Sequence, residues 1–310
     1  SNATFSGLVE AITGGAAGSV ATLDTVTLNG GLNADNKAGL VVELDTVTLA
    51  DGEDINIEAN ATVRLISDLD TAGLIIKGAG QFDGGNFSIS STALTLGADG
   101  ADANISNVSI TGGGTLALVA DTSSPDSNVR FEDVTILPVL DKVTNVALTF
   151  RDVNLLGGLT NSNNVATDDS PVIIEGTFDA ANASVAGKVQ VKSATVSNAT
   201  FSGLVEAITG GAAGSVATLD TVTLNGGLTI ADSAGIDLSV NDVIMAAGTT
   251  LNVENTSVIT MEVKGDLIAA TGSVNIDAAT ASLTFNIGGT DLAAITTNTQ
   301  SFDTDGYEAP

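Results

Sequence analysis

The chain of 310 residues contains no cysteine, no histidine and no tryptophan, and it has a single tyrosine. The absence of cysteine excludes disulfides, thiolate chemistry and cysteine-based zinc sites. Aromatic residues make up only 3% of the chain, whereas sugar-binding sites usually present aromatic platforms. A dedicated glycan-binding module is therefore disfavoured.

Basic residues are also scarce, with nine Lys and Arg against 37 Asp and Glu and a net charge of -28. Nucleic-acid binding needs a stripe of cations, so nucleic acid is excluded as a partner. The same deficit disfavours an anionic membrane surface. No apolar run approaches the ~18 residues of a membrane span, so direct membrane insertion is not expected. No secretion signal opens the chain, and the signal of an exported protein would lie outside these residues.

Small aliphatic side chains supply most of the hydrophobic residues, which make up 43% of the chain. Thr, Asn, Asp, Gly and Val fill much of the remainder. This composition favours short strands joined by tight turns over helices. The predicted fold class is all-β.

The opening segment 1–32, SNATFSGLVEAITGGAAGSVATLDTVTLNGGL, recurs without change at 197–228. At the same offset, the segment 33–58 keeps seven identities with 229–254. Self-similarity at a fixed offset indicates a duplicated structural unit. We predict a full solenoid repeat unit at 1–196, and a partial, diverged second copy at 197–310 that continues the same solenoid.

A shorter period lies inside the long one. The hexad LDTVTL begins at Leu23, Leu44 and Leu219. Related hexads begin at Ile105, Phe131, Phe150, Val196 and Val240, and weaker ones are placed at Val63, Phe82, Ile173, Met261 and Leu283. The clear hexads alone give a spacing of about 22 residues, which predicts one turn of a solenoid per hexad.

Each hexad predicts a bend. Its first, fourth and sixth positions are mostly apolar, so the alternation of a strand changes phase between the first and the fourth position. Asn and Asp at the third position tolerate the left-handed backbone of a sharp bend, whereas Thr does so less readily. Stacked rungs would place these residues in one column that shares hydrogen bonds from rung to rung. The column consists of Thr25, Thr46, Asn107, Asp133, Asp152, Asn198, Thr221 and Asp242.

This period, with its short strands and glycine-rich corners, resembles that of the right-handed parallel β-helix, the fold of pectate-lyase-like enzymes and of many bacterial adhesins and S-layer proteins. The resemblance rests on period and pattern, and it covers nearly the whole chain. Stacked strands lie ~4.8 Å apart, and small aliphatic side chains suit a narrow interior. The alternative is an array of tandem β-sandwich domains.

Calcium is the expected cofactor, because divalent cations are a natural counter-charge and prefer carboxylate and amide oxygens on turns. A solvated acidic surface, as in salt-adapted proteins, is the alternative interpretation. Three turn segments supply candidate ligands. They are Asp303, Asp305 and Glu308 in DTDGYE, Asp99, Asp102 and Asn104 in LGADGADAN, and Asp51, Glu53 and Asp54 in LADGEDIN.

The predicted function is that of an extracellular structural repeat protein that forms or extends a cell-surface filament, an S-layer or an adhesin stalk. The expected partners are other copies of the chain, through self-association into a polymer or layer, and cell-surface glycans. In a solenoid each rung contacts only its neighbours, so a unit can be copied without redesigning a core.

The alternative function is a carbohydrate-active β-helix enzyme, a polysaccharide lyase or a glycosidase. The resemblance implies a Lys or Arg base beside calcium for the lyases. For the glycosidases it implies clustered Asp residues, often with a His-containing motif, which this chain lacks. Asp168 and Asp169 form an adjacent acidic pair that could act as acid and base. A solvated turn explains the pair more simply, and we do not expect an enzyme.

Overall fold

The computed structural model describes residues 1–12, 18–97, 102–112, 115–118, 128–143, 146–162, 170–208, 215–230, 236–246, 248–253, 258–263, 267–269, 273–276, 282–287, 295–297 and 302–303. These residues form strands and turns and contain no helix. The described part accordingly offers no helix with the length and apolar character that crossing a membrane requires. The chain divides into two compact units, Ser1–Ser170 and Pro171–Pro310, which are described separately.

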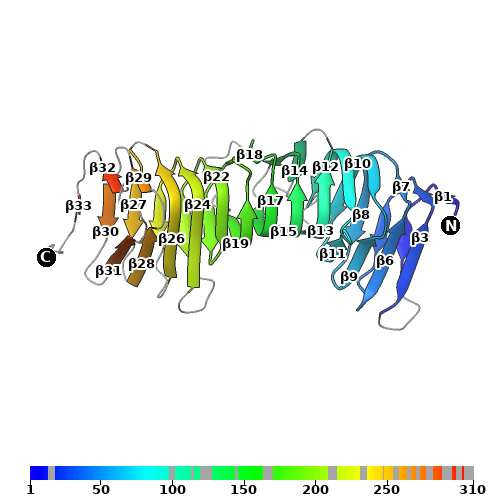
Figure 1. Ribbon diagram of the computed structural model, residues 1–310. Coiled ribbons are helices and arrows are strands. Elements are labelled where there is room, and N and C mark those ends of the chain that lie inside the picture. Colours follow the sequence, from blue (N-terminus) through cyan, green and yellow to red (C-terminus); the bar gives the residue numbers. More distant parts are fainter. Residues whose placement is uncertain are drawn as a thin grey trace. The chain divides into compact units, whose positions relative to one another are not determined.

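The strands of the first unit are short and follow one another at regular intervals (Figure 1). They are β1 (Ala3–Phe5), β2 (Val9–Ala11), β3 (Val20–Asp24), β4 (Val26–Leu28), β5 (Leu32–Ala34), β6 (Leu40–Asp45), β7 (Thr48–Leu49), β8 (Glu53–Ile57), β9 (Ala61–Leu65), β10 (Leu69–Lys77), β11 (Gln81–Asp83), β12 (Ser88–Leu96), β13 (Ala103–Thr111), β14 (Thr115–Leu118), β15 (Asn128–Ile136), β16 (Val139–Lys142), β17 (Ala147–Leu155) and β18 (Leu159–Asn161).

The second unit has the same character. Its strands are β19 (Val172–Asp179), β20 (Ser184–Val185), β21 (Val189–Lys192), β22 (Thr195–Phe201), β23 (Val205–Ile208), β24 (Ser215–Leu224), β25 (Leu228–Ile230), β26 (Ile236–Met245), β27 (Thr250–Val253), β28 (Val258–Val263), β29 (Leu267–Ala269), β30 (Ser273–Ile276), β31 (Ser282–Ile287), β32 (Ile295–Thr297) and β33 (Phe302–Asp303).

Parallel pairing between strands about 21 residues apart makes each unit a β-solenoid. In the first unit Leu23 of β3 pairs with Leu44 of β6, and in the second Leu219 of β24 pairs with Val240 of β26. The predicted parallel β-helix with about 22 residues per rung is therefore confirmed. The β-sandwich alternative is wrong, because its sheets would pair antiparallel strands.

Columns of buried apolar side chains fill the interior of each solenoid. In the first unit Ile105 pairs with Phe131, which pairs with Phe150, and each of these side chains is at most 1% exposed. The rings of Phe131 and Phe150 stack with centroids 5.7 Å apart. In the second unit Val196 pairs with Leu219 in the same way. Removing such side chains from water is the main favourable contribution to folding.

The hexads bend as their sequence predicts. All eight residues of the predicted column have a positive φ, between 49° and 56°. In β17 the buried residues are Leu148, Phe150, Val153 and Leu155, so the alternation changes phase at Asp152. The left-handed residue thus lets the strand turn while apolar side chains on both sides of the bend still face the core.

The Thr residues at bends depend on the Asp that precedes each of them. The hydroxyl groups of Thr25, Thr46 and Thr221 donate to the carboxylates of Asp24, Asp45 and Asp220, at 2.7, 3.1 and 3.1 Å. A charge-assisted hydrogen bond of this kind offsets part of the cost of a β-branched residue with positive φ. The repeated LDT triplet is therefore a single structural element.

The register predicted for the weaker hexads is less accurate. Phe82 pairs with Ile105 as predicted, but Leu44 pairs with Leu65 and not with Val63. Likewise, Val240 pairs with Val263 and not with Met261, and Phe178 replaces Ile173 as the partner of Val196. For Val63 and Met261 the error is two residues, which keeps the same set of residues on one face of the strand, so periodicity alone cannot detect it.

The repeat boundary predicted between residues 196 and 197 lies inside β22, whereas the compact units divide between Ser170 and Pro171. A sequence repeat can begin at any point of a rung, so its phase need not coincide with that of a compact unit. The assignment of 197–310 as a diverged copy that continues the same solenoid stays a prediction.

Glycines at the rung corners allow backbones to touch. A methyl group added at Gly203 would collide with the carbonyl of Gly187, and one added at Gly226 would collide with the backbone of Gly203. At Gly7, the residue equivalent to Gly203 in the first copy of the identical block, the added group would meet nothing within 4 Å. The same residue therefore has different packing in the two copies.

We expect Gly203→Ala to lower the free energy of unfolding by about 1–3 kcal/mol, because the methyl group overpacks a corner between two backbones. Gly7→Ala is the matched control, and its effect should stay within about 0.5 kcal/mol. Urea unfolding followed by far-UV circular dichroism measures both. Equal effects of the two substitutions would contradict the corner packing described here.

We also expect Thr221→Val to destabilise the protein by about 1 kcal/mol, because valine keeps the branched shape at positive φ but loses the hydroxyl that binds Asp220. Thr223→Val, two residues further along the same strand, is the control and should change stability by less than about 0.5 kcal/mol. The denaturation midpoints of the two variants decide the point. A Thr223→Val variant as unstable as Thr221→Val would contradict the role of the LDT triplet.

Candidate functional site

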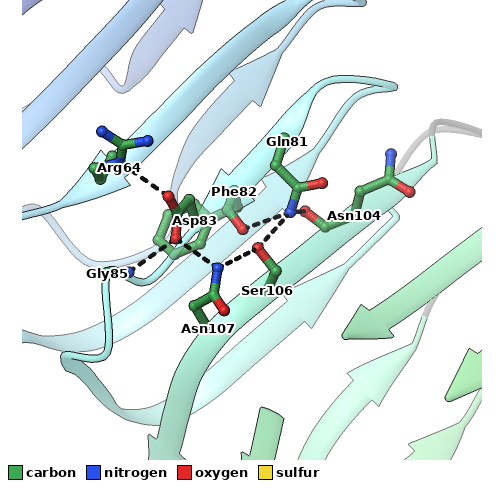
Figure 2. Close-up of polar contacts among 8 residues, drawn as sticks. All are labelled: Arg64, Gln81, Phe82, Asp83, Gly85, Asn104, Ser106 and Asn107. Atoms are coloured by element: carbon green, nitrogen blue, oxygen red, sulfur yellow. Dashed lines mark hydrogen bonds and ion pairs between the residues drawn. The ribbon is translucent and has the colours of Figure 1, made fainter. Parts of the chain in front are cut away.

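The densest described polar cluster surrounds Asp83 and joins three successive rungs (Figure 2). The carboxylate of Asp83 in β11 accepts hydrogen bonds from Nε of Arg64 at 2.9 Å, from the backbone N–H of Gly85 at 3.0 Å and from Nδ2 of Asn107 at 3.1 Å. Arg64 lies on β9 and Asn107 on β13. Parallel pairing brings these residues together, because Arg64 is the register partner of Asp83.

A second set of hydrogen bonds lies beside the first. Nε2 of Gln81 donates to Oγ of Ser106 at 2.9 Å and to the backbone carbonyls of Phe82 at 2.9 Å and Asn104 at 3.3 Å. Nδ2 of Asn107 also lies 3.3 Å from Oγ of Ser106, which links the two sets. Figure 2 shows one carboxylate in the cluster, already held by three donors. This arrangement is suited to holding rungs in register, because Arg64 and Asn107 bind Asp83 from the rungs on either side of it.

Two carboxyl groups of this region have a lowered pKa. Burial raises the pKa of Asp83, but the bonds from Gly85, Arg64 and Asn107 outweigh it, and the net pKa lies below the ordinary value. The pKa of Asp68 is lowered by the backbone N–H and the hydroxyl of Ser88, at 2.8 and 3.0 Å. Both carboxylates are therefore held in the charged form by donors from their surroundings.

The predicted calcium ligands Asp51, Glu53 and Asp54 lie around the start of β8. Asp51 is exposed on the preceding turn, and Asp54 forms an ion pair with Lys77 at 2.6 Å. Glu53 and Asp54 are consecutive strand residues, so their side chains point to opposite sides of the strand. The structure thus brings the three backbones together but separates two of the carboxylates.

Asp102 and Asn104 lie two residues apart at the start of β13 and share one face of the strand. Oδ1 of Asp102 accepts a hydrogen bond from the backbone of Asn128 at 2.9 Å. Nδ2 of Asn104 donates to the carbonyls of Ala79 and Gly80, both at 3.2 Å. These polar groups tie β13 to its neighbouring rungs. Asp99, the third member of this group, lies outside the described residues.

Of the third predicted calcium loop, only the first residue lies within the described part of the chain. Asp303 ends β33, while Asp305 and Glu308 lie outside the described residues. Within the part of the chain that the structure describes, no group of three or more Asp, Glu, His or Cys is arranged to hold a metal ion. Asp168 and Asp169, the acidic pair of the enzyme alternative, also lie outside that part.

The scarce cations act mainly as ties between rungs, which sequence reasoning missed. Among the described residues, five ion pairs join adjacent rungs. They are Lys77–Asp54 at 2.6 Å, Arg64–Asp83 at 2.9 Å, Lys188–Glu206 at 2.9 Å, Lys192–Glu175 at 3.2 Å and Arg151–Glu132 at 3.6 Å. A search for opposite charges one period apart would have found them. Exposed pairs of this kind contribute roughly 0–1 kcal/mol each.

One cation lies inside the solenoid instead. Lys142, the last residue of β16, is 2% exposed, and its Nζ donates to the carbonyl of Ser170 at 3.0 Å. A buried ammonium group needs such oxygen partners, because its desolvation is costly. The sequence gives no signal for this burial, because the segment VLDK resembles an ordinary strand that ends in polar residues.

Comparison of the chain with protein-family models, with curated proteins and with solved structures gave no significant match. The geometry of the described residues is therefore the basis for any functional conclusion. Its dominant features are parallel rungs, polar clusters that bridge them and an identical block used twice.

The lowered pKa of Asp83 predicts an acid-sensitive contribution to stability. A depressed folded-state pKa stabilises the fold above the unfolded value of about 4, and this contribution is lost as the pH falls through the folded-state pKa. We expect Asp83→Asn to be less stable than the parent chain by about 1 kcal/mol at pH 7, with the difference shrinking below pH ~4. Urea midpoints measured between pH 2 and pH 7 test this. A constant difference over that range would exclude a charge-dependent role of Asp83.

Proposed function

We propose that this protein is a structural repeat protein of the cell surface, which forms or extends a filament, a layer or an adhesin stalk by self-association, with calcium as its counter-ion. The observation that carries the proposal is the reuse of one identical block, 1–32 and again 197–228, as the same structural part. Thr25 and Thr221 have φ values of 54° and 56°, and Gly31 and Gly227 have values of 76° and 88°. An identical bend and an identical corner thus recur in two separate units.

Parallel stacking explains why such copying is useful. Each rung pairs with the rungs before and after it, as β24 does with β22 and β26. Stability is then close to a sum of rung and neighbour terms, so adding a unit lengthens the protein without disturbing its core. A function that depends on length or on repetition, such as that of a filament or stalk, fits this property.

The charge distribution supports the calcium part of the proposal. The net charge is -28. In the five inter-rung ion pairs, basic side chains neutralise carboxylates that lie on adjacent rungs. The excess of carboxylates over basic side chains needs cations from solution, and divalent ions with oxygen ligands meet that need best between molecules brought close together.

Negative-stain electron microscopy of the purified chain in EDTA, and again in millimolar calcium at matched ionic strength, tests the proposal. We expect filaments or sheets in calcium and separate particles in EDTA, because calcium lowers the repulsion between acidic copies. Magnesium at the same concentration is the control for simple charge screening. Separate particles under all three conditions would exclude calcium-dependent assembly, and antibody labelling confined to the interior of permeabilised native cells would exclude the surface location.

A further inference from the structure

The first rung of the chain exposes apolar side chains that are buried or less exposed in the second copy of the same block. Phe5 is 39% exposed, whereas its equivalent Phe201 is 0% exposed. Leu8 and Ile12 are 56% and 68% exposed in the first copy, whereas their equivalents Leu204 and Ile208 are only partly exposed. The two blocks have the same sequence, so the difference comes from their neighbours alone.

The structure shows what covers the second copy. β20 and β21 pair in parallel with β22 and β23, which places Val185 against Phe201 and Val189 against Val205. The carbonyl of Gly187 lies over Gly203 at the corner. The cover is therefore the rung of residues 171–196.

Polar groups complete this interface. Nζ of Lys188 lies 2.9 Å from Oε1 of Glu206, and Nε2 of Gln190 donates to Oε2 of the same carboxylate at 3.0 Å. A rung that covers the block thus brings a cation and an amide to one glutamate. The equivalent of Glu206 in the first copy is Glu10, which is exposed.

We propose that the face formed by residues 3–12 is a docking surface for a rung with the sequence of residues 171–196, carried by a repeat unit joined ahead of Ser1. This inference rests on the proposed function, and it names the joint through which units extend. The docking face has the same sequence as the face that residues 171–196 cover in the second copy. Its partner must therefore supply apolar side chains, groups that bind a glutamate and a backbone corner that fits against a glycine. A second copy of this chain does not offer that rung, because its residues 171–196 are already paired with β22 and β23.

The test uses single cysteines, because the chain has none of its own. Phe5→Cys is made in the full chain, and the same substitution is made in an extended chain in which residues 1–196 are joined directly ahead of Ser1. Phe201→Cys in the full chain is the reference for a covered rung. Labelling with a maleimide at several protein concentrations is the measurement, since a buried thiol reacts only when the structure opens.

We expect the thiol of Phe5→Cys in the full chain to react at least about 100-fold faster than that of Phe201→Cys, and the extension to slow it to the rate of the covered reference. The pair Val9→Cys and Val205→Cys repeats the comparison in case Phe201→Cys weakens the core, because Val9 is partly exposed and Val205 is buried. An extension that carries Val189→Asp is the control, and it should restore fast labelling because it buries an unpaired carboxylate at the joint.

Fast labelling of the thiols at positions 5 and 9 in the unmodified extended chain would overturn the proposal. Labelling of the unextended chain that slows as its concentration rises would also overturn it, since the occupant would then be a second copy. These outcomes are separate from the proposed function. Calcium-dependent filaments, together with an unprotected thiol at position 5 in the extended chain, would place the joint elsewhere. Protection in the extended chain without filaments or surface labelling would leave the joint intact and reject the surface-assembly role.

Discussion

The rest of the structure depends on one backbone constraint, the left-handed residue at the third position of each hexad. A left-handed conformation costs an ordinary L-residue roughly 1–2 kcal/mol, yet eight non-glycine residues adopt it at this position. Asn and Asp reduce this cost with their short polar side chains, and Thr relies on the carboxylate before it. Because stacked rungs must bend at the same place, the column of bends also fixes the register of the buried columns beside it.

This constraint explains which parts of the fold were predictable. The bend residue and the phase change are both written in the hexad, so the rungs that contain a clear hexad were placed correctly. Rungs without one are held only by alternation, and a shift of two residues leaves the same face buried. Because of this ambiguity, the sequence predicts Val63 and Met261 at these positions. The structure instead pairs Leu65 with Leu44, and Val263 with Val240.

The polar clusters were harder to predict for a different reason. The predicted calcium ligands are acids close together in sequence, but in a solenoid the nearest partner of a side chain lies one rung away. Asp83 binds Arg64 and Asn107, which are 19 and 24 residues distant. Consecutive acids such as Glu53 and Asp54 instead point to opposite sides of a strand. Local spacing is therefore a poor guide to polar sites in this architecture, and spacing by one period is a better one.

The same geometry gives the acidic charge a physical consequence. Asp24 and Asp45 are register partners, so like charges stack along the solenoid at the spacing of adjacent strands, ~4.8 Å. Each additional rung adds apolar contact with its neighbour but also adds to this repulsion, which exposed charges feel over about 10 Å at moderate ionic strength. Lengthening the protein is favourable only while burial of the kind seen at Phe201, and absent at Phe5, exceeds the added repulsion. In the proposed assembly, cations bound between carboxylates would shift that balance, and the number of stably stacked units would then depend on the ionic composition of the surroundings.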